Sequence, residues 1–67
     1  MDKNKAKAAI EAILFTMGES VEISRLAAVL EMDKQEVTAL LKEMDKDYRK
    51  ENRGIFLMWL EDSVQLL

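Results

Sequence analysis

The side chains that can carry chemistry in this sequence are mainly carboxylates, lysines and arginines, because its 67 residues include no histidine and no cysteine. The sequence therefore has no Ser-His or Cys-His nucleophile pair and no Cys/His cluster for zinc. Carboxylates can act as a general acid or base, but a domain of this length offers little concave surface to shape a pocket around them. We expect a protein that is not an enzyme and has no cofactor and no metal.

A second chemistry is the recognition of DNA by basic and amide side chains on a helix. Four such side chains share the outward face of one predicted helix: Gln35, Lys42, Lys46 and Arg49. A recognition helix in the major groove would present such a face. The alternative is a solvated face whose cations suit the negative end of the helix dipole. The formal net charge of −3 favours the alternative, because phosphate contacts dominate affinity for nucleic acids. We expect no direct sequence-specific contact with nucleic acid.

The elements that hold these side chains follow from the spacing of apolar residues. Residues 5–17 predict a helix that ends at Gly18, because glycine adopts the left-handed cap without steric cost. A short extended entry at residues 21–23 leads to a second helix that begins at the N-cap Ser24 and ends near residue 30. A third helix is predicted over residues 34–50.

The second and third helices form a helix-turn-helix pattern. Asp33 and Glu36 predict a capping box at the start of the third helix. Ala27 is small where the two helices cross, and Met32 fits under the turn, where Glu31 replaces the usual glycine. The expected inward residues of the two helices are Leu26, Ala27, Leu30, Val37, Leu40, Leu41, Met44 and Tyr48.

After Gly54 the sequence changes to a strand pattern. Residues 55–60 and 64–67 are rich in strand formers and flank a turn signal, so they predict a β-hairpin. Three helices followed by a hairpin wing make a winged helix-turn-helix, an α+β fold that is mostly α. One face of the hairpin must pack on the helices, and its expected inward residues are Ile55, Leu57, Leu60, Val64 and Leu66.

The remaining apolar residues of the hairpin are candidates for an interface. Phe56, Met58 and Trp59 are expected to form an exposed apolar patch, which is typical of protein interfaces. A bulge near Trp59 that turns some of these side chains inward is the alternative. We expect self-association through these three residues, supported by Phe15 on the first helix.

Several stretches of the sequence are similar to one known family. They are Ile10-Glu11-Ala12-Ile13-Leu14-Phe15, Gly18-Glu19, Leu26-Ala27-Ala28-Val29-Leu30, Arg53-Gly54-Ile55-Phe56-Leu57 and Val64-Gln65-Leu66. Over residues 8–67 the chain resembles the N-terminal winged-helix domain of the segregation and condensation protein B family.

The resemblance implies a non-enzymatic interaction and dimerisation module of a bacterial SMC–kleisin condensin, acting in chromosome condensation and segregation. It implies a homodimer that binds the kleisin, segregation and condensation protein A, and through it SMC. The implied location is the cytoplasm, in association with the nucleoid.

The family has two tandem winged helices, so we expect residues 1–67 to be a single winged-helix domain from the N-terminus of a longer two-domain protein. The apolar runs are too short to cross a bilayer, so no membrane partner is expected. The rival interpretation is a winged-helix transcription regulator that reads DNA through its third helix.

Overall fold

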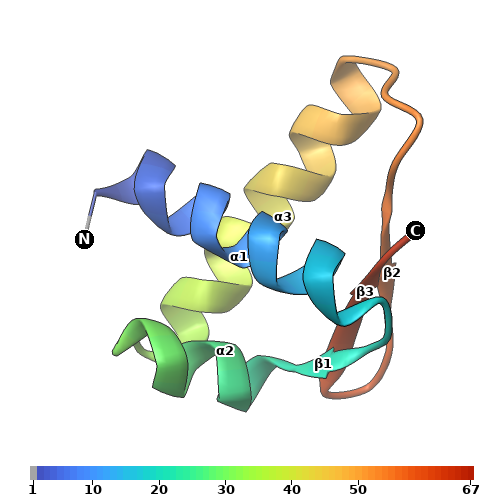
Figure 1. Ribbon diagram of the computed structural model, residues 1–67. Coiled ribbons are helices and arrows are strands. Elements are labelled where there is room, and N and C mark those ends of the chain that lie inside the picture. Colours follow the sequence, from blue (N-terminus) through green and yellow to red (C-terminus); the bar gives the residue numbers. More distant parts are fainter. Residues whose placement is uncertain (1) are drawn as a thin grey trace.

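A computed structural model describes residues 2–67, which form three helices and one small sheet (Figure 1). The predicted winged helix-turn-helix is confirmed, with the sheet at one side of the helices. No helix in residues 2–67 is long and apolar enough to cross a membrane. The elements are α1 (Lys3–Met17), β1 (Val21–Glu22), α2 (Ile23–Leu30), α3 (Lys34–Lys50), β2 (Leu57–Trp59) and β3 (Ser63–Leu66).

The sheet contains a strand that the sequence did not predict. Its three strands are antiparallel in the order β1-β3-β2, so that β3 lies in the middle. In β1, Val21 pairs with Val64 and Glu22 pairs with Ser63. Two residues are too few for a periodic signal. The predicted extended entry becomes a strand only because the hairpin provides its partner.

The start of α2 also depends on the hairpin. The helix begins at Ile23 with Glu22 as its N-cap, so the prediction that Ser24 is the N-cap is wrong. The backbone N–H of Ile23 donates to the carbonyl oxygen of Asp62 at 2.9 Å. That bond satisfies one of the donors that the first turn of a helix leaves without an intrahelical partner. A tertiary contact therefore takes the place of a side-chain cap.

The other helix ends agree closely with the sequence. Gly18 has a φ of 65°, and its N–H donates to the Leu14 carbonyl, as expected of a glycine cap. α1 begins two residues before the predicted start, at Lys3. At the start of α3, the Asp33 N–H donates to Glu36 Oε1 at 3.3 Å in the predicted capping box.

The core lies where α1 covers α3 and the inner face of the sheet. Every predicted inward residue of α2 and α3 is buried, and Met32 is half-buried beneath the turn. In the hairpin, Ile55 and Leu66 pack against the core as half-buried residues, whereas the expectation that Leu60 faces inward is wrong. The largest fully buried side chains are those of Ile10, Leu14, Leu26, Val37, Leu41 and Val64.

Candidate interaction surfaces

The outward side of the hairpin carries a row of exposed apolar side chains. Along β2 the side chains alternate, with Leu57 buried and Met58 exposed. Phe56 is 52% exposed, Met58 41% and Leu60 48%, and Leu67, which pairs with Phe56, is 42% exposed. We call these four residues the outer wing face. Leu67 was not among the predicted interface residues, and Leu60 was expected to face inward, although period-two spacing from Phe56 puts Leu60 on the outer side.

Trp59 does not belong to the outer wing face, and the expectation that its side chain points away from the core is wrong. Trp59 pairs with Val64, which is completely buried, and its side chain packs against the core as a half-buried residue. The register of β2 with β3 is continuous from Leu57 to Trp59, so no bulge turns the strand. Simple alternation therefore puts Trp59 on the same side as Leu57.

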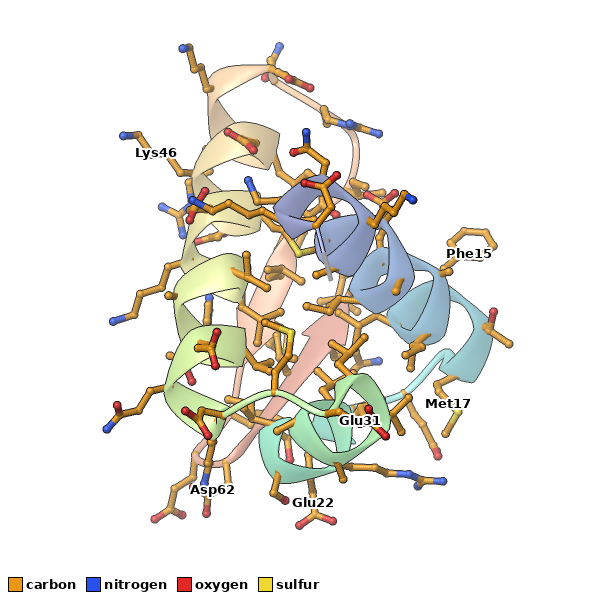
Figure 2. All side chains as sticks on the ribbon, turned by 90° about the vertical axis from the view of Figure 1, so that its left-hand side faces the viewer. Phe15, Met17, Glu22, Glu31, Lys46 and Asp62 are labelled. Carbon is orange, nitrogen blue, oxygen red and sulfur yellow. The ribbon has the colours of Figure 1, made fainter. Side chains whose placement is uncertain are left out.

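Phe15 lies on a different surface from the outer wing face. It is 78% exposed on α1 and points away from the body of the protein (Figure 2). Phe15 lines a shallow groove of about 390 Å³ between α1 and the core-facing side of the hairpin. We call this the α1 groove, and its lining residues are Ala8, Glu11, Ala12, Phe15, Thr16, Arg53, Ile55 and Leu66. The structure thus brings Phe56 and Met58 together and separates Phe15 from them.

One end of the α1 groove is fixed by a polar cluster. The Tyr48 hydroxyl donates to Glu11 Oε1, and the Arg53 guanidinium carbon lies 5.4 Å from the centre of the Tyr48 ring. Burial raises the pKa of the Tyr48 hydroxyl above its usual value, and its bond to the Glu11 carboxylate acts in the same direction. Arg53 also pairs with Glu51 at 3.4 Å. The charged groups here already have partners within the chain.

The candidate DNA-reading residues do share one face of α3. Gln35, Lys42, Lys46 and Arg49 are all exposed, and Figure 2 shows Lys46 directed into solvent. The face is not uniformly positive, because Arg49 Nε donates to Asp45 Oδ1 at 3.3 Å. A DNA-binding surface normally concentrates positive charge on one face. This arrangement is better suited to a solvated helix.

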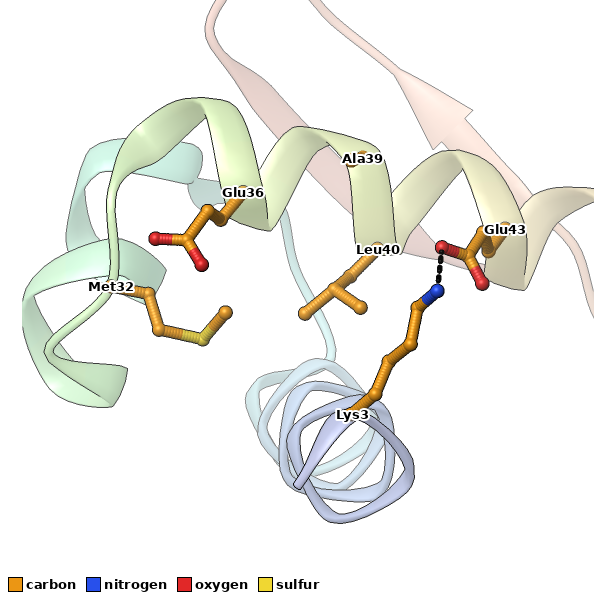
Figure 3. Close-up of a pocket in the computed structure, with 6 residues that line it drawn as sticks. All are labelled: Lys3, Met32, Glu36, Ala39, Leu40 and Glu43. Carbon is orange, nitrogen blue, oxygen red and sulfur yellow. Dashed lines mark ion pairs between the residues drawn. The ribbon is translucent and has the colours of Figure 1, made fainter. Parts of the chain in front are cut away.

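A second hollow lies where the start of α1 meets α3 (Figure 3). Lys3 Nζ lies 2.9 Å from Glu43 Oε2, and Lys7 Nζ lies 3.0 Å from Glu43 Oε1. The two ammonium groups hold the pKa of the Glu43 carboxyl below its ordinary value, and Glu43 raises the pKa of Lys7. These pairs tie α1 to α3. Among residues 2–67, no three acidic groups converge as metal ligands would.

Comparison with known proteins identifies similar sequences. The sequence model of one family, described as Segregation and condensation complex subunit ScpB, matches residues 8–67. Segregation and condensation protein B of Agathobacter rectalis is 48% identical over 61 residues, which are 90% of this chain and 33% of the relative. The same-named protein of Geobacillus kaustophilus is 47% identical over 58 residues, 85% of this chain and 27% of the relative. The chain spans about a third of the length of the curated relatives it matches.

Two solved structures have a similar fold. One is a crystal structure of a dimer of the ScpB N-terminal domain complexed with a ScpA peptide. It is 40% identical, with a TM-score of 0.88, and the match covers 96% of this chain and 80% of that one. The other is a crystal structure of ScpB from Mycobacterium tuberculosis, 25% identical, with a TM-score of 0.93. That match covers 100% of this chain and 42% of the other.

Proposed function

Because this chain belongs to the family of the segregation and condensation complex subunit ScpB, we propose that it is the dimerising N-terminal domain of a condensin accessory subunit. In this role it acts in chromosome condensation and segregation as a non-enzymatic interaction module. Residues 1–67 are then one winged-helix domain of a longer protein. The short span of the chain relative to its curated relatives supports this division.

The observation that carries the proposal is the outer wing face. Phe56, Met58 and Leu60 lie in one row on the hairpin, exposed to solvent and without a charged residue among them. Contiguous exposed apolar patches on small soluble domains mark surfaces that another chain covers. A wing that contacted DNA would instead present lysine or arginine to the phosphates. The wing therefore suits a protein partner better than a nucleic acid.

The proposed partners are a second copy of the chain and the kleisin, segregation and condensation protein A, which links the subunit to SMC. The related ScpB N-terminal domain forms a dimer complexed with a ScpA peptide, which supports both partners here. We assign self-association to Phe56 and Met58. Trp59 contributes only indirectly, because it packs on the core side of strand β2, next to Met58 in sequence. Phe15 is not assigned to this contact, because it lies on the α1 groove.

The experiment that tests the proposal is the molar mass in solution, measured by light scattering over a wide dilution series. We expect a value near twice 7.7 kDa at high concentration. The dimer is then titrated with the ScpA protein of the same genome, and with a random DNA duplex as the control. A monomer at every concentration, or no binding of ScpA by the dimer, contradicts the corresponding part of the proposal.

A further inference from the structure

Strand β2 forms an open edge of the sheet. It pairs with β3 on one side only, because the strand order is β1-β3-β2. Phe56 and Leu67 exchange two backbone hydrogen bonds, at 3.1 and 2.9 Å, and the N–H of Leu60 donates to the Ser63 carbonyl at 2.9 Å. These bonds show that Phe56 and Leu60, which flank β2 on either side, direct backbone groups toward β3 and the residues that continue it.

The remaining backbone groups of β2 point away from the sheet. Hydrogen-bonded and non-hydrogen-bonded pairs alternate along an antiparallel ladder. Since Phe56 and Leu60 bond to β3, Met58 between them does so as well, and Leu57 and Trp59 direct their N–H and C=O groups toward the open edge. The edge thus presents two donors and two acceptors in line.

This edge lacks the features that normally prevent strands from pairing. Natural edge strands are protected by charged side chains, proline, bulges or a covering element. Residues 55–60 read Ile-Phe-Leu-Met-Trp-Leu, with no charge and no proline, and the register of β2 is continuous. The opposite edge, β1, has two residues, includes Glu22 and runs directly into α2. Only β2 is both open and apolar.

We propose that two copies of this chain associate by antiparallel pairing of their β2 strands, centred on Met58, so that two three-stranded sheets become one continuous sheet. The inference rests on the proposed self-association and gives it a geometry. Leu57 of one copy then lies opposite Trp59 of the other, and the reverse. Each of these two pairs exchanges two backbone hydrogen bonds, which uses all the outward-pointing groups of the strand.

The side chains favour the same register. Met58 of one copy faces Met58 of the other at the two-fold axis, and Phe56 faces Leu60, so the exposed rows of the two outer wing faces lie side by side and pack against each other along the seam. The acidic turn residues Glu61 and Asp62 lie beyond the paired segment, so the like charges of the two copies do not face each other. A register centred on Leu57 would oppose Trp59 with Ile55, which lies beyond the residues that pair with β3 and its continuation.

A disulfide cross-link tests the geometry directly. The chain has no cysteine, so Met58→Cys introduces a single thiol. At the axis the two α-carbons form a non-hydrogen-bonded pair about 4.5 Å apart, which is within the range of roughly 4.4–6.8 Å that a disulfide spans. We expect a covalent dimer on mild oxidation. The matched control is Gln65→Cys, because Gln65 pairs with Met58 but lies on the middle strand, too far from the axis to cross-link.

A second measurement needs no substitution. Amide hydrogen exchange of the unmodified chain should slow at Leu57 and Trp59 as the concentration rises, because their N–H groups bond only in the dimer. The Met58 amide should be protected at every concentration because it bonds to β3. If the exchange rates of the Leu57 and Trp59 amides do not change with concentration although light scattering shows a dimer, strand pairing is wrong.

The outcomes separate this inference from the proposed function. A dimer by light scattering whose Met58→Cys variant does not cross-link, or whose Gln65→Cys variant cross-links as well, associates through another surface. Strand pairing is then wrong, while self-association stands. A chain that remains monomeric at every concentration contradicts self-association itself, and the pairing with it.

Discussion

The hydroxyl of Tyr48 on α3 donates a hydrogen bond to the carboxylate of Glu11 on α1. The ring of Tyr48 is buried between these helices, and the guanidinium of Arg53 lies over its face. One side chain therefore joins α1, α3 and the segment that leads into the wing. Its two partners, Glu11 and Arg53, both line the α1 groove, so the loss of Tyr48 should affect both the stability of the fold and the shape of that groove.

Tyr48→Phe is expected to lower the free energy of unfolding. The substitution keeps the buried ring but removes the hydroxyl, so the Glu11 carboxylate loses a partner in a half-buried position. Hydrogen bonds to charged groups contribute about 1.5–3 kcal/mol, and we expect a loss near the lower end because Glu11 can still reach water. Urea denaturation measures it. An unchanged midpoint, with an unchanged slope, would show that the bond contributes nothing to stability.

Phe56→Glu is expected to weaken self-association by about tenfold or more, since burying a phenylalanine is worth roughly 1.5–3 kcal/mol. The glutamate would also bring a charge into an apolar contact. The measurement is the dimer dissociation constant from light scattering, with circular dichroism to confirm that the fold survives. Phe15→Glu is the matched control, because Phe15 is more exposed and lies on a different surface. Equal weakening by both variants would argue against the outer wing face.

The helical part of the fold follows from local signals in the sequence. Helical spacing of apolar residues, Gly18 and the Asp33–Glu36 capping box indicated the three helices, and the same spacing indicated the buried faces of α2 and α3. Apart from the start of α1, which lies two residues before its predicted position, the errors in the elements involve the hairpin. Strand β1 and the first residue of α2 depend on pairing with Val64 and on the carbonyl of Asp62, which are about forty residues away in sequence. Local patterns carry no information on such contacts.

The candidate surface was only partly predictable for the same reason. Alternation along a strand indicates which residues share a face, but not whether a bulge interrupts it. The continuous register puts Trp59 with Leu57 on the core side and leaves Phe56 and Met58 outside. The open edge of β2 depends on the strand order, which arises from β1 pairing on the far side of β3. Phe15 was expected to support self-association through the wing residues, but it lies on the α1 groove instead of the outer wing face, which only the three-dimensional arrangement shows.

Glu31→Gly is expected to raise the free energy of unfolding by about 0.5–1 kcal/mol. Glu31 ends α2 with a φ of 55°, in the left-handed region, where its Cβ is strained. Glycine relieves the strain, although the added freedom of the unfolded chain offsets part of the gain. The matched opposite is Gly18→Ala, which puts a Cβ at a φ of 65° and should lower stability. Thermal denaturation of both variants measures this, and a destabilised Glu31→Gly contradicts the account.

Acid is expected to destabilise the fold partly through Glu43. Its pKa is lowered in the folded protein by Lys3 and Lys7, from an ordinary value of 4.5. A lowered folded-state pKa means that the stabilisation is fully present above pH 4.5 and is lost as the pH falls through the folded value. The effect is small, because these groups are solvated. Glu43→Gln should therefore flatten the fall of stability with acid, as measured by urea denaturation on both sides of that pH. If the free energy of unfolding falls with pH equally steeply in the variant and in the parent, the ion pairs of Glu43 do not contribute to the acid destabilisation.

The face of α3 that carries Gln35, Lys42, Lys46 and Arg49, here called the α3 face, is expected to show no measurable binding of random duplex DNA. Lys42 and Lys46 are exposed, but Arg49 is paired with Asp45, and the whole chain carries a net charge of −3. A DNA reader binds at low salt and loses affinity steeply as salt rises, because its contacts release counterions from the phosphates. Fluorescence anisotropy of a labelled duplex over a salt series measures this. Binding that weakens with salt, and that Lys42→Glu with Lys46→Glu abolishes, would instead assign the α3 face to nucleic acid. With that result, the proposed dimer would present two DNA-binding faces, one on the α3 helix of each copy.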